Sequence, residues 1–325
     1  MSLVGRVAVI IVNYNAGDYL RKSVISVKNQ DFKDFGIIVV DNASKEFPLT
    51  GQEDWMEGVT LIRLEKNIGF AAANNLAVEA AEGCEWIALL NPDAFAHPNW
   101  LSKLMQATER WPGYSVFASR MVNAANPDLL DGAGDVYCVS GRAYRRGYSE
   151  NSAGLYSQDE DVFAPCGGAA LYRRSVFLGV GKFDEDFFCY MEDVDLGCRL
   201  QLAGYRCKYI SAAIVDHVGS GITGLQSEFT VYHGHRNLEW VFFKNMPGFL
   251  LLLYLPIHVF LVIGSIASYS FRGMARVILR AKLDALRGLS DVTAKRRSVQ
   301  LGRSISLRAF RRIMSYEPII GINMR

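Results

Sequence analysis

The sequence has no pair of closely spaced cysteines and none of the cysteine and histidine spacings that mark a metal site. Its cysteines stand singly, several of them in apolar stretches that suit buried free thiols: Cys84, Cys138, Cys166, Cys189, Cys198 and Cys207. A secretory leader is also missing, because the apolar residues 7–12 are too few and no cleavage site follows them. These absences predict a reducing, cytoplasmic setting.

Internal repeats, low-complexity segments and the dinucleotide-binding fingerprint G-x-G-x-x-G are absent as well. The first apolar run leads instead into Asn13-Tyr14-Asn15-Ala16-Gly17. A nucleotidyltransferase would have a glycine-rich loop with Arg or Lys at this place, to grip a triphosphate. That class of enzyme is therefore disfavoured.

Hydrophobic residues make up 50% of the 325 residues and aromatic residues 12%, which is enough for a substantial core and excludes a disordered chain. The net charge of +2 conceals an asymmetry. Residues 272–325 hold 13 Lys and Arg against 3 Asp and Glu, so this segment carries +10 and residues 1–271 carry −8. The sequence predicts an acidic body followed by a basic tail, and we expect no nucleic-acid partner.

Strand and helix patterns alternate through the first 120 residues. Apolar runs over 7–12, 36–40, 59–64 and 86–90 predict buried strands, and residues 19–29 and 70–81 have helical spacing. This repetition predicts a parallel, doubly wound α/β sheet.

The middle of the chain is less regular. Residues 127–161 are polar, contain Arg142, Arg145 and Arg146, and predict a loop or hairpin insertion near the site. Residues 192–204 predict an amphipathic helix, and 207–210 a short strand with His217 on the loop beyond it.

Polar residues follow each of the first three predicted strands. They are Asn13, Asn15, Asp41, Asn42, Asn67 and Gly69. Taken singly, each asparagine is explained by turn chemistry. Because the carboxyl ends of parallel strands meet at the edge where open α/β sheets bind ligands, the set together predicts a nucleotide site.

The fourth apolar run ends in the short acidic turn Asn91-Pro92-Asp93. A carboxylate on a turn stiffened by proline suits a hard divalent cation that binds a diphosphate. The alternative is a helix N-cap, since Asp is common in turns. The polar residues at the neighbouring strand ends favour the cation site.

Glu192, Asp193 and Asp195 place carboxylates at the start of the helix predicted over 192–204. Acidic residues complement the helix dipole there, but a partly desolvated carboxylate among neighbours also suits a base that takes a proton from an alcohol. Arg199 is spaced to pair with Asp195 and leave Asp193 free. His217 can bind a metal, although a single histidine is usually structural.

Residues 246–271 contain no Asp, Glu, Lys or Arg, which meets the length of about 20 apolar residues that a membrane span requires. A buried core helix, or a surface covered by a second subunit, has the same composition. A single span would export the basic tail, against the positive-inside rule. We therefore expect a re-entrant or in-plane hairpin bent at Pro256, with the tail on anionic headgroups.

These motifs resemble those of the inverting family 2 glycosyltransferases with the GT-A fold, in particular the rhamnosyltransferase-like branch of bacterial cell-surface polysaccharide synthesis. The resemblance covers roughly residues 6–245. It rests on Val12-Asn13-Tyr14-Asn15, Val40-Asp41-Asn42-Ala43-Ser44, Asn67-Ile68-Gly69-Phe70 with Asn74-Asn75, Asn91-Pro92-Asp93, Tyr190-Met191-Glu192-Asp193-Val194-Asp195 and Asp216-His217-Val218-Gly219.

The resemblance implies a mixed, mainly parallel sheet flanked by helices. It implies a GT-A domain over 1–240, with a nucleotide-binding half (1–120) and an acceptor half (121–240), and a membrane-associated helical segment over 241–325. In the first half, Asp41 would read the pyrimidine nucleoside, and Asn74 would belong to the donor-binding set.

For the reacting groups, the resemblance implies that Asp93 binds Mg²⁺ or Mn²⁺ against the donor's diphosphate, with His217 as a second contact. Asn91 stands where the family usually has the first Asp of Asp-x-Asp. Asp193 would be the general base that deprotonates the acceptor hydroxyl, and Glu192 would shape the acceptor pocket.

The implied function is transfer of L-rhamnose from dTDP-rhamnose to a polyprenyl-diphosphate-linked saccharide at the cytoplasmic face of the bacterial inner membrane. Transfer of a hexose or N-acetylhexosamine from a UDP-linked donor is the alternative, because uracil and thymine share the edges that a protein bonds. A hypothesis from a different functional class is a non-catalytic membrane scaffold. Such a scaffold would have lost Asp93 or Asp193, and both are present. The apolar segment is also compatible with a homodimer.

Overall fold

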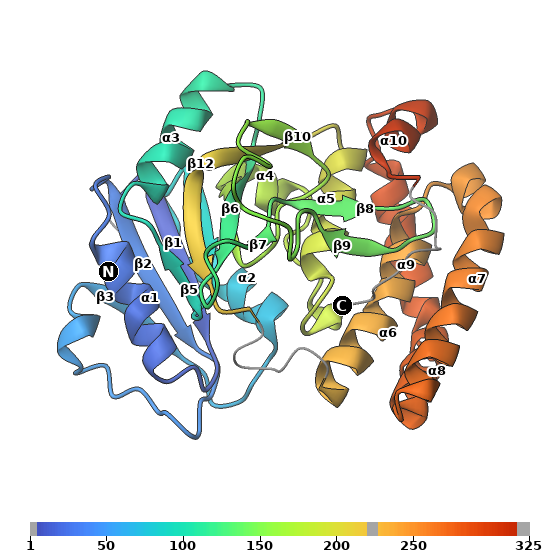
Figure 1. Cartoon of the computed structure of the whole chain (residues 1–325), viewed down its shortest axis with the longest axis horizontal. Helices are drawn as coiled ribbons and strands as arrows, with labels where there is room; N and C mark the ends of the chain where they lie inside the picture. Colours follow the sequence, from blue (N-terminus) through green and yellow to red (C-terminus); the bar gives the residue numbers. More distant parts are fainter. Residues whose placement is uncertain (1–4, 220–226, 317–325) are drawn as a thin grey trace.

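The apolar βα repeats of the first third of the chain form the parallel half of a ten-stranded sheet (Figure 1). In this computed structural model, which describes residues 5–219 and 227–316, the strand order is β10-β12-β6-β11-β4-β1-β2-β3, with β5 paired to β12 and β7 paired to β6. The strands are β1 (Val7–Asn13), β2 (Phe35–Asp41), β3 (Val59–Arg63), β4 (Trp86–Leu90), β5 (Ala94–Ala96), β6 (Val116–Asn123), β7 (Leu130–Gly132), β10 (Glu160–Val162), β11 (Ala169–Arg173) and β12 (Cys207–His217).

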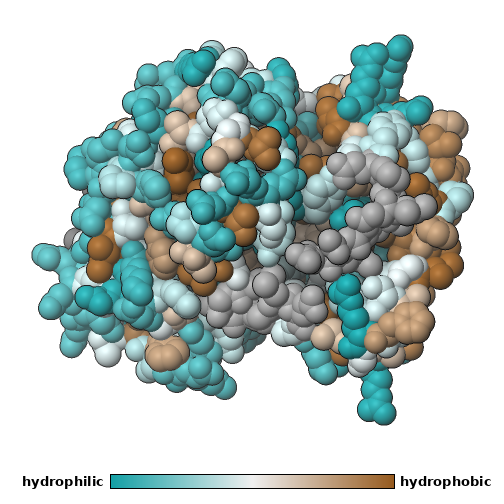
Figure 2. Space-filling view, viewed as in Figure 1, coloured by the Kyte–Doolittle hydropathy of each residue, from teal (hydrophilic) through white to brown (hydrophobic). Residues whose placement is uncertain are grey.

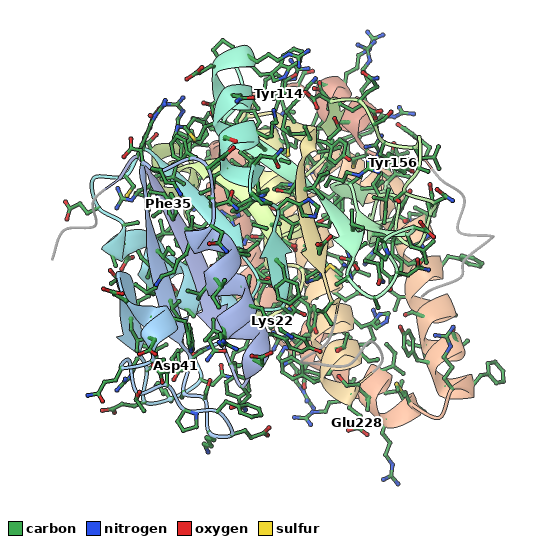
Figure 3. All side chains as sticks on the ribbon, turned by 60° about the vertical axis from the view of Figure 1, so that its left-hand side comes forward. Lys22, Phe35, Asp41, Tyr114, Tyr156 and Glu228 are labelled. Atoms are coloured by element: carbon green, nitrogen blue, oxygen red, sulfur yellow. The ribbon has the colours of Figure 1, made fainter. Side chains whose placement is uncertain are left out.

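The strands β1 to β4 run parallel, and β1 pairs with β2 from Val7 opposite Phe35 to Asn13 opposite Asp41. Strand β12 is parallel to β6, whereas β11 is antiparallel to both β4 and β6. The sheet is therefore mixed and mostly parallel, which confirms the predicted fold class. In Figure 3, Asp41 and Phe35 mark the two ends of β2, and Asp41 lies at the edge where the parallel strands end.

Helices cover both faces of the sheet because side chains alternate along each buried strand. Odd-numbered residues of β1 pack with α1 and α3, and even-numbered ones pack with α2, α4 and α5. These helices are α1 (Asp18–Lys28), α2 (Phe70–Ala80), α3 (Trp100–Arg110), α4 (Arg174–Gly179) and α5 (Glu192–Leu202), with short 3₁₀ turns η1 (Asp54–Met56) and η2 (Glu185–Phe187).

Strand β12 corrects one prediction. The sequence predicts a strand that ends at Ile210 with His217 on a loop, but β12 continues to His217. The pairing with β6 shifts register between Ile210 and Ile214, and the strand then pairs with β5 up to Ala94. This irregularity interrupts the apolar pattern, so the sequence suggests an end where the strand only bulges.

The polar insertion predicted over 127–161 contains a hairpin of β8 (Asp135–Tyr137) and β9 (Ala143–Arg145). In Figure 1 this hairpin reaches from the body of the molecule toward the helices at the right of the view. The carbonyl of Ser140, at its tip, lies 2.8 Å from His258 Nδ1. The insertion therefore links the sheet to the C-terminal helices.

The C-terminal helices form a unit on one side of the body (Figure 1). They are α6 (Glu228–Asn245), α7 (Gly248–Phe271), α8 (Ala275–Arg287), α9 (Leu289–Leu301) and α10 (Leu307–Ile313). A third apolar cluster joins them to α5 through residues such as Val194, Trp240 and Phe310. The basic segment is therefore a packed helical unit as far as residue 316, and its last residues, 317–325, lie outside the described part. Helix α6 crosses residue 240, so the expected boundary falls inside a helix.

Helix α7 corrects the prediction of a hairpin bent at Pro256, because it runs unbroken from Gly248 to Phe271 through that proline. A proline inside a helix costs about 3 kcal/mol. One side of α7 is packed against the body at Leu250, Tyr254, His258, Leu261 and Ser265, and this packing offsets the cost. Among the described helices, α7 is long and apolar enough to cross a membrane, and only 28% of its most apolar stretch is buried.

Candidate active site

A cavity of about 1560 Å³ lies at the carboxyl ends of the parallel strands, between the sheet and the C-terminal helices. Most of the predicted site residues line it. They are Asn15, Asn42, Asn67, Gly69, Asn91, Asp93, Glu192, Asp193 and His217. The structure thus brings residues from both halves of the chain to one hollow, as the strand-end argument predicts.

At the ends of β2 and β3, Asn42 and Asn67 fix the loop after β3. The Asn42 side-chain amide donates to Asn67 Oδ1 at 2.9 Å, and Asn42 Oδ1 accepts from the Ile68 backbone N–H at 2.9 Å. Asn67 Oδ1 also accepts from the Gly69 N–H at 2.9 Å. These loops are held in one conformation by bonds between the asparagines themselves.

Asn13, Asp41 and Asn74 do not line the cavity. Asp41 Oδ1 accepts from the Asn13 amide at 2.9 Å and from the Ser44 hydroxyl at 2.6 Å. The Asn74 amide donates to the carbonyl of Phe70 in its own helix. Their contact with a nucleoside stays a prediction, and the bonds in the structure give each of them a structural role.

Asn15 lines the cavity with a backbone φ of 55°, a left-handed conformation that Asn tolerates. Its side-chain oxygen accepts from the backbone N–H groups of Lys45 and Glu46 at 2.8 and 3.1 Å. The turn-chemistry explanation therefore holds for this side chain, while its position places it at the cavity wall.

The predicted metal residues meet beside Asn91. Asp93 Oδ1 lies 3.3 Å from His217 Nε2, and the Asn91 amide nitrogen lies 3.4 Å from the same ring atom. The other ring nitrogen, His217 Nδ1, lies 2.7 Å from Asp131 Oδ2. A carboxylate oxygen and an imidazole nitrogen at this separation form a donor set that fits a divalent cation, with Asp131 orienting the histidine from behind.

The charge state of His217 follows from these contacts. Burial alone would lower the pKa of His217, but the hydrogen bonds with Asp131 and Asp93 raise that pKa to about 9, so the ring is protonated at neutral pH when no cation is bound. A divalent cation that binds Nε2 would displace the proton from that atom. Arg145 pairs with Asp131 and, with His217, holds the pKa of Asp131 below its usual value despite burial. The sequence analysis missed Asp131, because it lies in a glycine-containing polar stretch without a recognisable spacing.

Glu192 and Asp193 open α5 and line the cavity. Asp193 accepts from the backbone N–H of Gly167 at 2.9 Å and from its neighbour Val194 at 2.8 Å. Burial raises the pKa of Asp193, and the backbone N–H groups oppose the rise. Burial and the charge of Asp193 raise the pKa of Glu192 well above its usual value, and Glu192 Oε2 is buried without a described hydrogen-bond partner.

Asp195 points away from the cavity, as the spacing to Arg199 predicts. Arg199 Nε donates to Asp195 at 2.9 Å, and Lys244 and the Asn245 amide also contact this carboxylate, at 2.9 and 2.8 Å. Burial opposes its ionisation, but Arg199 and Lys244 hold the pKa of Asp195 at about 2. Asp195 therefore anchors α5 to α6, and Asp193 is the carboxylate left facing the cavity.

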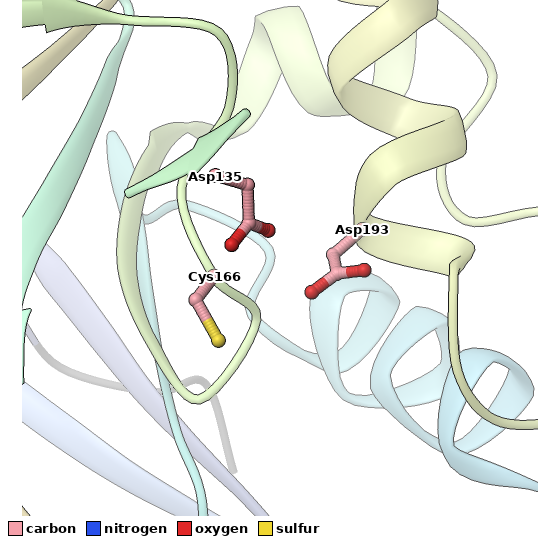
Figure 4. Close-up of side chains that lie close together, drawn as sticks. All are labelled: Asp135, Cys166 and Asp193. Atoms are coloured by element: carbon pink, nitrogen blue, oxygen red, sulfur yellow. The ribbon is translucent and has the colours of Figure 1, made fainter. Parts of the chain in front are cut away.

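Asp135 and Cys166 lie next to Asp193, and the sequence analysis did not connect them (Figure 4). One ligand atom from each of the three residues lies within 4.8 Å of the others. Burial, and then the charge of Asp193, raises the pKa of Asp135 well above its usual value, and Asp135 Oδ1 has no described hydrogen-bond partner. Burial likewise raises the pKa of the Cys166 thiol.

The turn before α5 is strained. Phe188, Tyr190 and Met191 have positive φ values of 64°, 69° and 68°, which non-glycine residues rarely adopt. Gly69, on the nucleotide side, packs so tightly on this turn that an added Cβ would lie 2.6 Å from the Phe188 carbonyl oxygen. The backbone N–H of Ala71 donates to the same oxygen at 3.2 Å. The loop after β3 and the turn before α5 are thus in direct contact.

The chain is similar in sequence to a known family and to individual named enzymes. Residues 8–180, more than half of the chain, match the sequence family described as Glycosyl transferase family 2. An N-acetylglucosaminyl-diphospho-decaprenol L-rhamnosyltransferase of Mycobacterium tuberculosis is 28% identical over 244 residues, which are 66% of this chain and 77% of that protein. The rhamnosyltransferase WbbL of Escherichia coli K12 is 28% identical over 236 residues, 65% of this chain and 83% of WbbL.

Solved structures show the same fold. The crystal structure of S. aureus TarS 1-349 in complex with UDP has a TM-score of 0.55 and 16% identity, covering 91% of this chain and 90% of that one. GalNAc-T7 with UDP, GalNAc and Mn²⁺ has a TM-score of 0.58 and 16% identity over 73% of this chain, and the chain spans 47% of that neighbour. With the family match over more than half of its length, the chain belongs to glycosyl transferase family 2 and is a glycosyltransferase.

Proposed function

We propose that the protein transfers L-rhamnose from dTDP-rhamnose to a polyprenyl-diphosphate-linked saccharide by direct displacement, with inversion at the sugar. The observation that carries the proposal is that Asp193 and the Asp93–His217 pair line the same cavity. The names of the M. tuberculosis relative and of WbbL support the sugar, and the first of them supports the acceptor class. The UDP complex of TarS supports a nucleoside diphosphate as the leaving group.

On the acceptor side, Asp193 takes the proton of the attacking hydroxyl. Two backbone N–H groups orient its carboxylate, and the pKa raised by burial makes it a stronger base than an exposed aspartate. Burial and the charge of Asp193 raise the pKa of Glu192 well above its usual value, which favours the protonated form, and in that form Glu192 would donate a hydrogen bond to the acceptor saccharide. A single base suffices, because displacement by the acceptor forms no covalent intermediate with the enzyme.

On the leaving-group side, Asp93 and His217 would hold Mg²⁺ or Mn²⁺. The cation would neutralise the diphosphate as it leaves. Asp131 keeps the Nε2 atom of His217 directed at Asp93 by bonding the opposite ring nitrogen. Asn91 contributes an amide beside this pair instead of a second carboxylate.

The nucleoside would lie over the strand ends of residues 1–120. Asn42, Asn67 and Gly69 form the rigid wall of this part of the cavity, and Asn15 forms the opposite wall. Asn13 and Asp41 support these loops from below, and Asp41 stays our candidate for reading the pyrimidine. Residues 121–240 then supply the acceptor half.

Residues 241–325 would attach the enzyme to the cytoplasmic face of the inner membrane. The outer face of α7 exposes large apolar residues, such as Leu252 at 72% and Phe260 at 60% (Figure 2, brown at the right-hand side). Helix α8 packs beside α7 and carries exposed arginines, among them Arg280 and Arg287. A spanning α7 would draw these arginines into hydrocarbon, so we favour a helix lying in the plane of the interface.

A transfer assay with purified protein tests the proposal. The enzyme is incubated with Mn²⁺, a synthetic polyprenyl-diphosphate-linked N-acetylglucosamine and dTDP-rhamnose, UDP-glucose or UDP-N-acetylglucosamine in turn. We expect product from dTDP-rhamnose alone, and none after chelation of the metal. The exchange Asp186→Asn, at an exposed acid of η2, serves as a control that keeps activity.

Other results have distinct meanings. Product from a UDP-linked sugar would replace the rhamnose assignment with the alternative hexose or N-acetylhexosamine donor. Absence of any product, together with absence of dTDP and UDP binding in calorimetry, would favour a non-catalytic membrane scaffold. Sedimentation with anionic vesicles tests the membrane surface, and a dimer at the same concentration without vesicle binding would assign the apolar face of α7 to a second copy.

A further inference from the structure

The cavity does not end at the catalytic carboxylates. It continues as a groove between α6 and α7, which we call the α6–α7 groove. Its wall is formed by Gly234, His235 and Leu238 of α6 and by Leu261, Ser265 and Tyr269 of α7. The rings of His235 and Tyr269 meet at 4.7 Å between centroids and close its far end.

The lining of the α6–α7 groove is uncharged. Burial, and then the charge of Lys282, lowers the pKa of His235 to about 3, so the imidazole is neutral. Gly234 leaves the groove open, because a Cβ added there would meet no atom within 4 Å. An uncharged trough of this kind suits an aliphatic guest better than a saccharide or a nucleotide.

A cation stands where the groove joins the catalytic part of the cavity. Arg142 lines the cavity at the tip of the β8–β9 hairpin, with its guanidinium 4.9 Å from the Tyr144 ring centroid. Arg145 and Arg146 of the same hairpin pair with Asp131 and Glu160. Arg142 forms no ion pair with a carboxylate of residues 5–219 and 227–316, so within this part of the chain its charge at the cavity has no acidic counter-ion.

The hairpin tip is fixed on the two helices that form the groove. Besides the contact of Ser140 with His258 of α7, Gly141 lies against Phe242 of α6, where an added Cβ would come within 2.7 Å of the ring. Gly141 has a φ of 83°, which lets the tip turn sharply at this contact. The cation and the groove therefore have a fixed relation to each other.

We propose that the α6–α7 groove binds the first isoprenoid units of the lipid-linked acceptor and that Arg142 binds its diphosphate, so that the saccharide extends toward Asp193. This inference rests on the proposed function and adds the subsite for the lipid. A guanidinium forms bidentate hydrogen bonds with phosphate oxygens, and the order of a cation followed by an uncharged trough matches the order of a diphosphate followed by a prenyl chain. The exposed apolar face of α7 would hold the groove at the bilayer from which the chain comes.

Binding of farnesyl diphosphate, measured by calorimetry on the full chain, tests the groove without turnover. We expect binding to the wild type and a loss of about tenfold to a hundredfold in affinity for Arg142→Ala. Gly234→Leu fills the groove and should weaken binding at least about tenfold, while the helix is not destabilised because leucine has the higher helix propensity. Matched controls are Arg146→Ala on the same hairpin and Gly264→Leu on the exposed side of α7, which should leave the affinity unchanged.

Transfer assays give a second readout. Arg142→Ala and Gly234→Leu should raise KM for the polyprenyl-diphosphate acceptor but leave KM for a methyl glycoside of the same saccharide unchanged. Equal effects on both acceptors, or absence of farnesyl diphosphate binding to the wild type, would overturn the inference even if rhamnose is transferred. Farnesyl diphosphate binding with the expected variant pattern, but without transfer of any sugar, would support the groove and reject the proposed reaction.

Discussion

The nucleotide side and the acceptor side of the cavity are built on different principles. On the nucleotide side, the polar groups bond one another, as Asn42 does with Asn67 and Asn13 does with Asp41. On the acceptor side, Asp135 and Glu192 each keep a buried oxygen without a described partner, and their pKa values are raised. On the first side, the hydrogen bonds of the polar groups are made within the protein. On the second side, the buried oxygens of Asp135 and Glu192 are available to a substrate.

This difference explains what a substitution on each side should do. Breaking a self-bonded loop alters the shape of a binding wall and costs some affinity. On the other side, removing the base Asp193 costs the reaction, and removing the charge of Asp135, which has an unpartnered oxygen, relieves the fold of an unfavourable burial. The predictions below test this contrast, beginning with the largest expected effect.

Substitutions of two aspartates in the same turn of α5 should have opposite effects, one on the reaction and the other on stability. We expect Asp193→Asn to lower kcat by about 10²- to 10⁴-fold with an unchanged melting temperature, because the base is lost and the shape is kept. Asp195→Asn should destabilise the fold by about 3 kcal/mol or more, because Arg199 and Lys244 lose their buried counter-charge. Transfer assays and thermal unfolding of both variants measure this; a folded, fully active Asp193→Asn would reject the base assignment.

The acidity of Asp193 gives this prediction a pH dependence. Since its pKa is raised above 3.8, the wild type should lose kcat as the pH falls through that raised value, where the base becomes protonated. Asp186→Asn should keep the same profile. A profile that Asp193→Asn retains would assign the titration to another group.

The residue behind the metal pair should matter next. Asp131→Asn removes the charge that orients His217, so we expect Mn²⁺ to bind about 10- to 100-fold more weakly in the presence of dTDP. Calorimetry measures the affinity, and Asp128→Asn, an exposed neighbour, is the control. Unchanged Mn²⁺ affinity would show that His217 is not oriented through Asp131.

Substitutions of asparagine compare the cavity wall with the helix behind it. Asn42→Ala removes the bonds that hold the loop after β3, and we expect the affinity for dTDP to fall about tenfold. Asn74→Ala loses a single bond within α2 and should change stability by about 1 kcal/mol, with a smaller loss of dTDP affinity than Asn42→Ala because Asn74 does not line the cavity. A larger loss of dTDP affinity for Asn74→Ala than for Asn42→Ala would invert this assignment.

The smallest effect concerns Asp135. Its pKa is raised in the folded protein, so between the unfolded value of 3.8 and the raised value the unfolded state releases a proton that the folded state keeps. The wild type therefore loses stability as the pH rises from 3.8 toward that raised value. Asp135→Asn should remove this loss and gain about 1 kcal/mol at neutral pH with no gain at pH 3.5, as denaturant unfolding at both values would show. An equal gain at the two pH values would contradict the argument.

The two sides of the cavity also differ in how much of them can be predicted from the sequence. Local patterns predict β1 to β4, α1 and α2, and the strand-end positions of Asn42 and Asp93, because each βα unit forms from neighbouring residues. The pairing of Asp195 with Arg199 also follows from helix spacing. These features require only local geometry.

The missed features depend on contacts between distant segments. Asp131 and Asp135 reach the site because the insertion folds back over the sheet, and no spacing along the chain indicates that approach. His217 ends a strand whose irregular register hides its length. Pro256 suggests a break, but packing of α7 on the body keeps the helix whole. Tertiary packing overrides the local signal in each case.

The contact of Gly69 with Phe188 has a kinetic consequence. Because the loop that would bind the nucleotide touches the strained turn in front of Asp193, we expect binding of one substrate to affect binding of the other. We expect a compulsory order of addition, in which the sugar nucleotide arrives first and sets that turn before the second substrate is admitted. Initial-rate measurements should then show that the released nucleoside diphosphate competes with the sugar nucleotide and not with the acceptor. Hydrolysis of the sugar nucleotide by water should stay slow until the acceptor binds.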